Sequence, residues 1–328
     1  MPVPTFSHNL EDVVLQGVFA ELADGFFIDV GAGTPIRDSN TYALYQKGWT
    51  GVAMEPLPMR ELWKAFRPRD VFVNTAAGSD AGDLELHLYE SLQLSSAAPA
   101  TLAHWADNHR APFKRISVPV MTLDQVCRQH RPFGEIHLLS VDVEGMEQQV
   151  LEGLDLAKYR PWVILLEATT PGTHVQSHQQ WEPDLVRRGY MMAFNDGINR
   201  YYLAQEHHGL LERFASPNSD PGFYTRTKED AQALALEEKQ LTVQISQVLL
   251  GTDAQNQSED QSASELADVE SVFRCTKCGE ASAPVAVKDF LRCSRCGARL
   301  HLMGTRKKRL FSIGILVIGA VVAWAIAR

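Results

Sequence analysis

Acidic residues next to glycines mark the part of the chain best suited to chemistry. Asp29 precedes Gly31 and Gly33 at the end of one apolar run, and Glu55 ends the next. A glycine turn lets the backbone approach a ligand closely, because glycine carries no Cβ. An acidic residue about twenty positions further on can accept hydrogen bonds from the hydroxyls of a ribose. This spacing predicts a cofactor site rather than a purely structural turn.

The neighbouring residues indicate which nucleoside the turn accepts. A dinucleotide site needs a third glycine where this chain has Ile36. The negative charge of Asp29 would also lie unfavourably beside a pyrophosphate. It suits a cationic ligand, such as the amino group and sulfonium of S-adenosylmethionine. We therefore expect S-adenosylmethionine as the cofactor.

A second acidic pair follows a later apolar strand. Asp142 and Glu144 come at the end of the run 136–143. Ligands of open α/β sheets bind outside the carboxyl ends of the strands, which is where this pair would lie. The alternative is that both residues only cap the helix that follows. Glu11 and Asp12 are likewise interpreted as caps of an opening helix over 7–22.

Alternating strands and helices must position these side chains. Apolar runs at 26–30, 51–54, 71–77, 136–143 and 162–166 predict strands of a parallel sheet. Two further runs, joined through Asn195-Asp196-Gly197, predict an antiparallel hairpin. Such a hairpin beside a parallel sheet is typical of methyltransferases rather than dehydrogenases. The stretch 91–115 is expected to be an irregular lid or substrate loop.

With these motifs in place, the chain resembles FkbM-type S-adenosylmethionine-dependent methyltransferases over roughly residues 7–204. The resemblance rests on several short motifs: Glu11-Asp12-Val13-Val14-Leu15, Phe27-Ile28-Asp29-Val30-Gly31-Ala32-Gly33, Gly48-Trp49-Thr50-Gly51, Glu55-Pro56, Val141-Asp142-Val143-Glu144-Gly145-Met146-Glu147, Val150-Leu151-Glu152-Gly153 and Asp196-Gly197-Ile198-Asn199-Arg200-Tyr201-Tyr202. It implies an α/β, Rossmann-like class I methyltransferase fold, with a mostly parallel seven-stranded sheet and a closing antiparallel hairpin. It also implies O-methylation of sugar hydroxyls in glycans and glycosylated natural products.

The resemblance also assigns roles to single residues. Asp29, Gly31 and Gly33 would hold the methionine end of the cofactor, and Glu55 the ribose. Ala76 and Ala77 would flank the adenine. Asp142 and Glu144 would lie beside the reacting methyl group, where a carboxylate can accept the hydroxyl proton. Alternatively, the pair could hold a divalent cation. No histidine stands at an obvious ligand spacing to them, so we favour the metal-free version.

The charge of the chain is divided unevenly. The net charge is −9, but the segment from Arg274 onward has 11 Lys+Arg against 2 Asp+Glu, which gives +9. The remainder has 20 against 38, which gives −18. An acidic body disfavours nucleic acid as a partner, whereas the basic tail suits an anionic surface.

Two Cys-x-x-Cys pairs stand in the basic segment. Cys275 and Cys278 are followed, after fourteen residues, by Cys293 and Cys296. Four thiolates at this spacing predict one tetrahedral Zn²⁺ in a small zinc ribbon. Because closed Cys₄ sites are structural, we expect a folding nucleus or a docking module for a protein partner rather than a catalytic centre.

The last apolar stretch predicts a membrane anchor. Residues 310–327 carry no charge, and at 1.5 Å per residue a helix of that length reaches about 27 Å. The basic run 306–309 precedes it, which places the catalytic body in the cytoplasm by the positive-inside rule. A single-pass, tail-anchored protein acting on a membrane-bound sugar acceptor would fit this arrangement.

The expected organisation has five parts. They are an FkbM-like methyltransferase domain over 1–223, a helix over 224–250, a flexible linker over 251–270, the zinc ribbon over 271–302 and the transmembrane helix over 310–327. Two alternatives to a sugar O-methyltransferase stay open. One is a non-enzymatic membrane adaptor built on the same fold, and the other is a methyltransferase with a lipid, small-molecule or protein acceptor.

Overall fold

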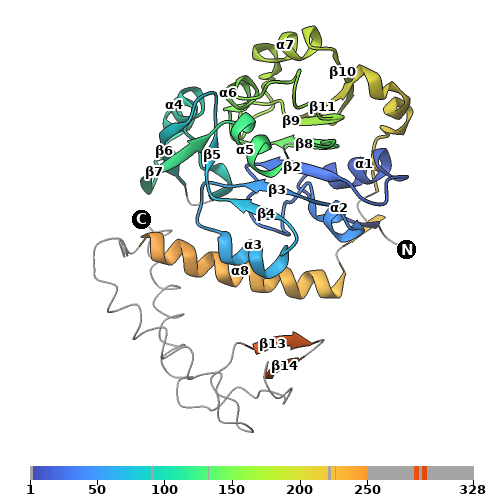
Figure 1. The fold of residues 1–328 in the computed structure, drawn as a ribbon. Coiled ribbons are helices and arrows are strands. Elements are labelled where there is room, and N and C mark those ends of the chain that lie inside the picture. Colours follow the sequence, from blue (N-terminus) through green and yellow to red (C-terminus); the bar gives the residue numbers. More distant parts are fainter. Residues whose placement is uncertain are drawn as a thin grey trace, which may run out of the picture. The chain divides into compact units, whose positions relative to one another are not determined.

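A computed structural model gives the fold of the chain (Figure 1). The structure describes residues 3–89, 92–131, 133–220, 223–225, 227–249, 284–287 and 290–293. The described residues up to 249 belong to one compact unit, and the last two ranges belong to a second. The helix expected over 224–250 is therefore part of the same unit as the predicted catalytic domain.

A seven-stranded sheet forms the centre of the first unit, in the order β10-β11-β9-β8-β2-β3-β4 (Figure 1). Its strands are β2 (Phe26–Val30), β3 (Thr50–Met54), β4 (Val71–Val73), β8 (Leu138–Val141), β9 (Val163–Glu167), β10 (Tyr190–Asn195) and β11 (Asn199–Ala204). Neighbours from β9 to β4 are parallel, whereas β11 is antiparallel to both β9 and β10. This confirms a mostly parallel sheet closed by an antiparallel hairpin.

Helices cover both faces of the sheet, because side chains alternate along each strand. Phe27 and Leu138 pack with helices α1 and α2 on one face. Ile28 and Leu139 pack with α5, α6 and α7 on the other. The bounds of these helices are α1 (Glu11–Val18), α2 (Tyr42–Lys47), α5 (Leu123–His130), α6 (Glu147–Glu152) and α7 (Glu182–Arg187). The carboxyl ends of the parallel strands stay uncovered by this packing and are available for a site.

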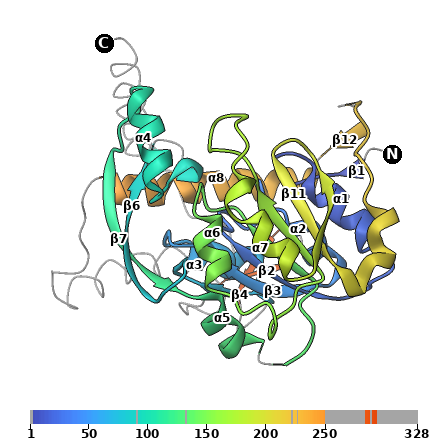
Figure 2. The ribbon, with the colours of Figure 1, turned by 90° about the horizontal axis from the view of Figure 1, so that it is seen from above.

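A smaller sheet of three strands, in the order β5-β7-β6, lies beside the main one. It consists of β5 (Ala76–Ala77), β6 (Gly82–Leu88) and β7 (Lys114–Met121). The expectation of an irregular stretch over 91–115 was wrong, since helix α4 (Pro99–Asp107) forms there and stands beside β6 and β7 (Figure 2). Proline at the start of α4 suits a first turn, and Trp105 packs edge-on against Tyr89 at 4.5 Å between ring centroids.

Shorter elements complete the first unit. They are β1 (Val3–Pro4), α3 (Arg60–Phe66), η1 (Leu92–Leu94), η2 (His178–Gln180), η3 (Gln205–Arg213), β12 (Tyr224–Thr225) and α8 (Lys228–Leu249). The strands β1 and β12 pair with each other in parallel, so the start of the chain is joined to the segment that precedes α8. Helix α8 follows directly and runs beside α3 (Figure 1).

The second unit is described only as an antiparallel pair, β13 (Pro284–Val287) and β14 (Phe290–Cys293). Cys293 ends β14, and the other three cysteines of the predicted zinc ribbon lie outside the described residues. The predicted linker and the predicted transmembrane helix over 310–327 also lie outside them. Within the described ranges, no helix has the length and hydropathy to cross a membrane.

Candidate active site

A cavity of about 870 Å³ opens at the carboxyl ends of β2, β3, β8 and β9. This volume lies in the range of small-molecule and cofactor sites, roughly 300–1,000 Å³. The predicted site residues that line it are Gly31, Gly33, Glu55, Ala76, Ala77, Asp142 and Glu144. The fold therefore gathers into one cavity every residue predicted for the cofactor and the reaction, with the exception of Asp29.

Glycine is needed at the two positions of the turn for different structural reasons. Both adopt a positive φ, +73° at Gly31 and +54° at Gly33. A Cβ on Gly31 would overlap the backbone carbonyl oxygen of Asp142, whereas a Cβ on Gly33 would meet no atom within 4 Å. Gly31 thus lets the end of β2 lie against the end of β8. Gly33 keeps space open in the cavity wall, as a turn that cradles a ligand requires.

Asp29 points away from the cavity. Its carboxylate is buried and accepts a hydrogen bond of 2.6 Å from the hydroxyl of Thr41, the residue that precedes α2. Burial raises the pKa of Asp29, against the hydrogen bond from Thr41 and the positive charge of Arg67, which lower it. Side chains alternate along β2, so Asp29 lies on the α2 face together with Phe27. Its predicted contact with the methionine end of the cofactor stays a prediction.

Glu55 lies at the cavity wall and holds the glycine turn. One carboxylate oxygen accepts from the backbone N–H of Gly33 at 3.0 Å, and the other from the N–H of Leu57 at 2.9 Å. Burial raises the pKa of Glu55 to about 7, although both N–H donors lower it. A carboxylate offers about four acceptor positions, so two stay available for ribose hydroxyls. The geometry is compatible with the predicted role.

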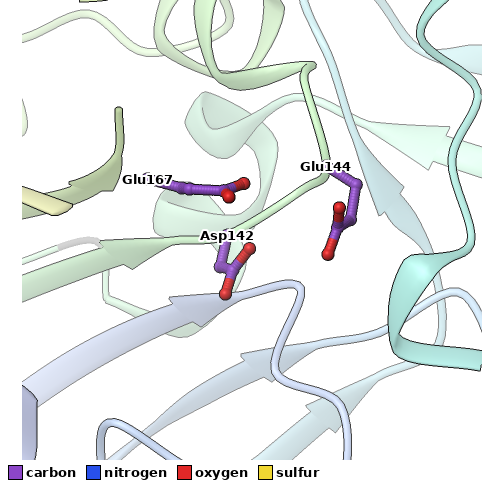
Figure 3. A group of neighbouring side chains, drawn as sticks. All are labelled: Asp142, Glu144 and Glu167. Atoms are coloured by element: carbon purple, nitrogen blue, oxygen red, sulfur yellow. The ribbon is translucent and has the colours of Figure 1, made fainter. Parts of the chain in front are cut away.

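Three carboxylates gather at the ends of β8 and β9. Asp142, Glu144 and Glu167 each offer an oxygen within 4.8 Å of the other two, and Figure 3 shows the carboxylates facing one shared space. Asp142 is exposed to the cavity, whereas Glu144 and Glu167 are half-buried. One oxygen of Glu144 and one of Glu167 are buried without a hydrogen-bond partner.

Electrostatics makes three negative charges in this cluster unfavourable. For each residue, burial is the largest cause of a raised pKa, and the neighbouring carboxylates raise it further. The cluster can bind a shared proton, or it can bind a cation. An all-carboxylate set of this kind suits a hard cation such as Mg²⁺ or Ca²⁺, which needs no histidine ligand.

The turn that carries Glu144 is fixed by its neighbours. Glu144 itself has a positive φ of +55°. Its backbone carbonyl accepts hydrogen bonds from the hydroxyls of Ser96 and Thr101, at 2.8 and 3.1 Å. Glu147 is buried, and its carboxylate accepts from the N–H of Gly145 at 3.1 Å. The segment around α4 therefore helps to position the acidic cluster.

Sequence reasoning missed several residues of this cavity. Glu167 directly follows the predicted strand over 162–166, and nothing in its local sequence indicates a role in the site. Glu11 was interpreted as a helix cap, yet it lines the cavity and accepts a hydrogen bond of 2.8 Å from the amide of Asn199. Burial raises the pKa of Glu11 to about 7. Its neighbour Asp12 does not cap α1 either: its carboxylate accepts from the backbone N–H of Phe6 at 2.8 Å, in the segment before the helix.

Comparison with known proteins agrees with this geometry. The family model of the methyltransferase FkbM domain matches residues 29–192, which is half of the chain. No curated protein matched the chain in a second comparison. The matched range begins in β2 and ends in β10, so it includes the glycine turn, Glu55 and the three carboxylates of Figure 3. The chain therefore belongs to the methyltransferase FkbM family.

Proposed function

We propose that the protein is an S-adenosylmethionine-dependent O-methyltransferase. Its acceptor would be a sugar hydroxyl of a glycan or glycolipid, at the cytoplasmic face of a membrane. One observation supports this proposal above the others: the glycine turn, Glu55 and the acidic cluster line the same cavity. A cofactor held by the first two would have its reactive end near carboxylates that can accept a proton.

The cofactor would be bound by residues that leave room for it. Gly33 has open space where a side chain would be, and Glu55 keeps acceptor capacity for ribose hydroxyls. Ala76 and Ala77 line the cavity with small apolar side chains that suit the flat face of adenine. When bound, S-adenosylmethionine supplies an activated methyl group.

Asp142 is the residue we assign as proton acceptor. Its carboxylate lines the cavity, and the loss of solvation there, together with the nearby charge of Glu147, raises its pKa to about 7. A base with a pKa near the working pH is best suited to removing the proton that the acceptor hydroxyl must lose. The nearby carboxylates of Glu147 and Asp29 raise the pKa of Asp142 and so keep it basic. In the alternative version, Asp142, Glu144 and Glu167 bind a divalent cation that lowers the hydroxyl pKa.

The binding experiment uses the full chain, purified with detergent present. We expect calorimetry to show binding of S-adenosylmethionine and none of NAD⁺. We then expect transfer of a labelled methyl group to sugar-containing lipids or glycans from a membrane extract. Absence of binding by the folded protein would favour the membrane adaptor. Binding with transfer only to a protein, lipid or small molecule would change the acceptor class.

The C-terminal segment carries separate proposals. Cys275, Cys278, Cys293 and Cys296 would bind one structural Zn²⁺, and residues 310–327 would anchor the chain in a membrane. We expect one zinc per chain by elemental analysis and its loss in the Cys293→Ser variant. Deleting residues 310–328 should move the protein from the membrane fraction to the soluble fraction. A zinc-free native protein, or an unchanged membrane fraction, would contradict the respective proposal.

A further inference from the structure

Helix α8 packs against the catalytic unit through one regular face. Asp230, Leu234, Glu237 and Leu241 recur at spacings of four and three, which places them on one side of a helix. The first three are buried, with Glu237 fully so. Leu236, by contrast, is exposed on the far side. The family match ends at residue 192, so this helix lies beyond the matched range.

The first half of this face docks on α2 and the start of the chain. The carboxylate of Asp230 accepts a hydrogen bond of 3.2 Å from the amide of Gln46. Leu234 joins Phe6 and Ile36 in one hydrophobic cluster. These contacts hold α8 beside α3 at one edge of the unit (Figure 1).

The second half reaches the turn of the cofactor site. The two carboxylate oxygens of Glu237 accept hydrogen bonds from the backbone N–H groups of Ile36 and Arg37, at 2.9 and 3.1 Å. These residues follow the glycine turn directly, and Thr34 and Arg37 line the cavity. One turn further along α8, Leu241 lines the cavity itself. A buried carboxylate that bonds two amides makes strong, directional contacts.

The opposite side of the same turn is held by the body of the domain. The indole N–H of Trp63 donates to the carbonyl of Gly33 at 3.0 Å, and Glu55 accepts from the N–H of Gly33. Residues 33–37 are therefore fixed on one side by α3 and β3, and on the other side by α8. Removal of either support would leave the turn with fewer restraints.

We propose that α8 completes the cofactor site: Glu237 is a positioning residue that holds the segment Thr34–Arg37 in its binding geometry, and Leu241 forms part of the cavity wall. This inference rests on the proposed function, because it assigns α8 to the binding of S-adenosylmethionine. Because coupling between two sites is reciprocal, docked α8 favours cofactor binding and bound cofactor stabilises α8 in its docked position. The helix that leads to the cysteine-containing segment would thus be coupled to cofactor binding.

The test compares Glu237→Gln with Glu229→Gln in the full-length protein. Glutamine replaces one acceptor oxygen of Glu237 by a donor that faces an N–H group, whereas Glu229 lies exposed on the same helix. We expect at least fivefold weaker S-adenosylmethionine binding by calorimetry for Glu237→Gln and no change for Glu229→Gln. The KM for the cofactor should rise, with kcat at saturating cofactor and the KM for the acceptor unchanged. If Glu237 only stabilised the fold, its substitution would not raise the KM for the cofactor while leaving kcat and the KM for the acceptor unchanged.

Each outcome has one meaning. If the wild type binds S-adenosylmethionine and Glu237→Gln binds it equally well, the inference about α8 is overturned while the proposed function stands. If the folded wild type does not bind it, the proposed function fails, and the assignment of α8 to a cofactor site fails with it. If Glu237→Gln does not fold, Leu241→Ala decides, because it leaves both hydrogen bonds in place. Weaker binding by Leu241→Ala supports the inference, and full affinity overturns it.

Discussion

The carboxylate of Glu55 accepts a hydrogen bond from the backbone N–H of Gly33 at 3.0 Å. Through this bond, the residue at the end of β3 fixes the turn that follows β2. The side chain predicted to bind the ribose is thus also a support of the turn that cradles the ligand. A carboxylate with two roles of this kind makes cofactor affinity sensitive to its protonation state.

We expect cofactor affinity to rise with pH as Glu55 ionises. Burial raises its pKa to about 7, so it is mostly protonated below that pH and accepts ribose hydroxyls less well. Affinity for S-adenosylmethionine should therefore increase between pH 6 and pH 8. The affinity of Glu55→Gln for the cofactor should be about tenfold weaker at pH 8, because the variant loses one hydrogen bond to a charged group. Calorimetry at both pH values tests this, with exposed Glu61→Gln as control. A pH-independent wild type would contradict the assignment.

Asp142→Asn should reduce turnover by about 10²–10⁴-fold, the usual contribution of a general base. The amide cannot accept the hydroxyl proton, whereas cofactor affinity should change little. The wild-type rate should rise with pH through about 7, where the raised pKa of Asp142 places its ionisation, and then level off. Methyl transfer at saturating cofactor measures both effects. Asp83→Asn, exposed on β6, is the matched control. Full activity in Asp142→Asn would remove this residue from the mechanism.

Activity should survive removal of divalent cations if Asp142 acts as the base alone. The measurement is methyl transfer after dialysis against EDTA, repeated with Mg²⁺, Mn²⁺ or Ca²⁺ added back. Chelation that abolishes activity, with recovery on adding one of these ions, would assign the cluster to a cation instead. In that case, Glu144→Gln and Glu167→Gln should each weaken binding of the ion, so that a higher ion concentration is needed to restore activity.

Glu167→Gln should stabilise the free protein at alkaline pH. Burial and the charges of Asp142 and Glu144 raise the pKa of Glu167 in the folded protein above its unfolded value of about 4.5. The free energy of unfolding therefore has its full value below pH 4.5, where Glu167 is protonated in both states. It falls as pH rises toward the folded pKa, because ionisation is unfavourable in the cluster. Glutamine does not ionise and so avoids this loss. We expect Glu167→Gln to raise the free energy of unfolding by about 1–3 kcal/mol at pH 8 and to change it little at pH 5. Urea unfolding at both pH values measures it. An equal effect at the two pH values would contradict the electrostatic origin.

The two glycines of the turn should respond differently to alanine. Gly31→Ala should lower the free energy of unfolding by roughly 3 kcal/mol or more, because the new Cβ overlaps the carbonyl of Asp142 at a positive φ. Gly33→Ala meets no atom within 4 Å and should cost about 1–2 kcal/mol for the left-handed backbone alone. Urea denaturation compares the variants directly. Equal losses would show that the packing of β2 against β8 is not the cause.

Local patterns in the sequence determined the class of the fold. Short apolar runs over 26–30 and 136–143 predicted buried parallel strands, and Asp196-Gly197 between two further runs predicted the hairpin of β10 and β11. Each of these signals depends on neighbours within a few positions, where residue type limits backbone conformation. The convergence of Glu55 and Asp142 on one cavity followed from the rule that parallel strands end at the same edge.

Only the tertiary structure decided which side chains meet. Glu167 joins Asp142 and Glu144 because β8 and β9 are neighbours in parallel register. Asp29 turns toward Thr41 because its position on β2 faces α2. Glu237 reaches the N–H of Ile36, about two hundred positions earlier in the chain. Such contacts depend on strand order, register and helix docking, which are set by the packing of the whole core rather than by local periodicity.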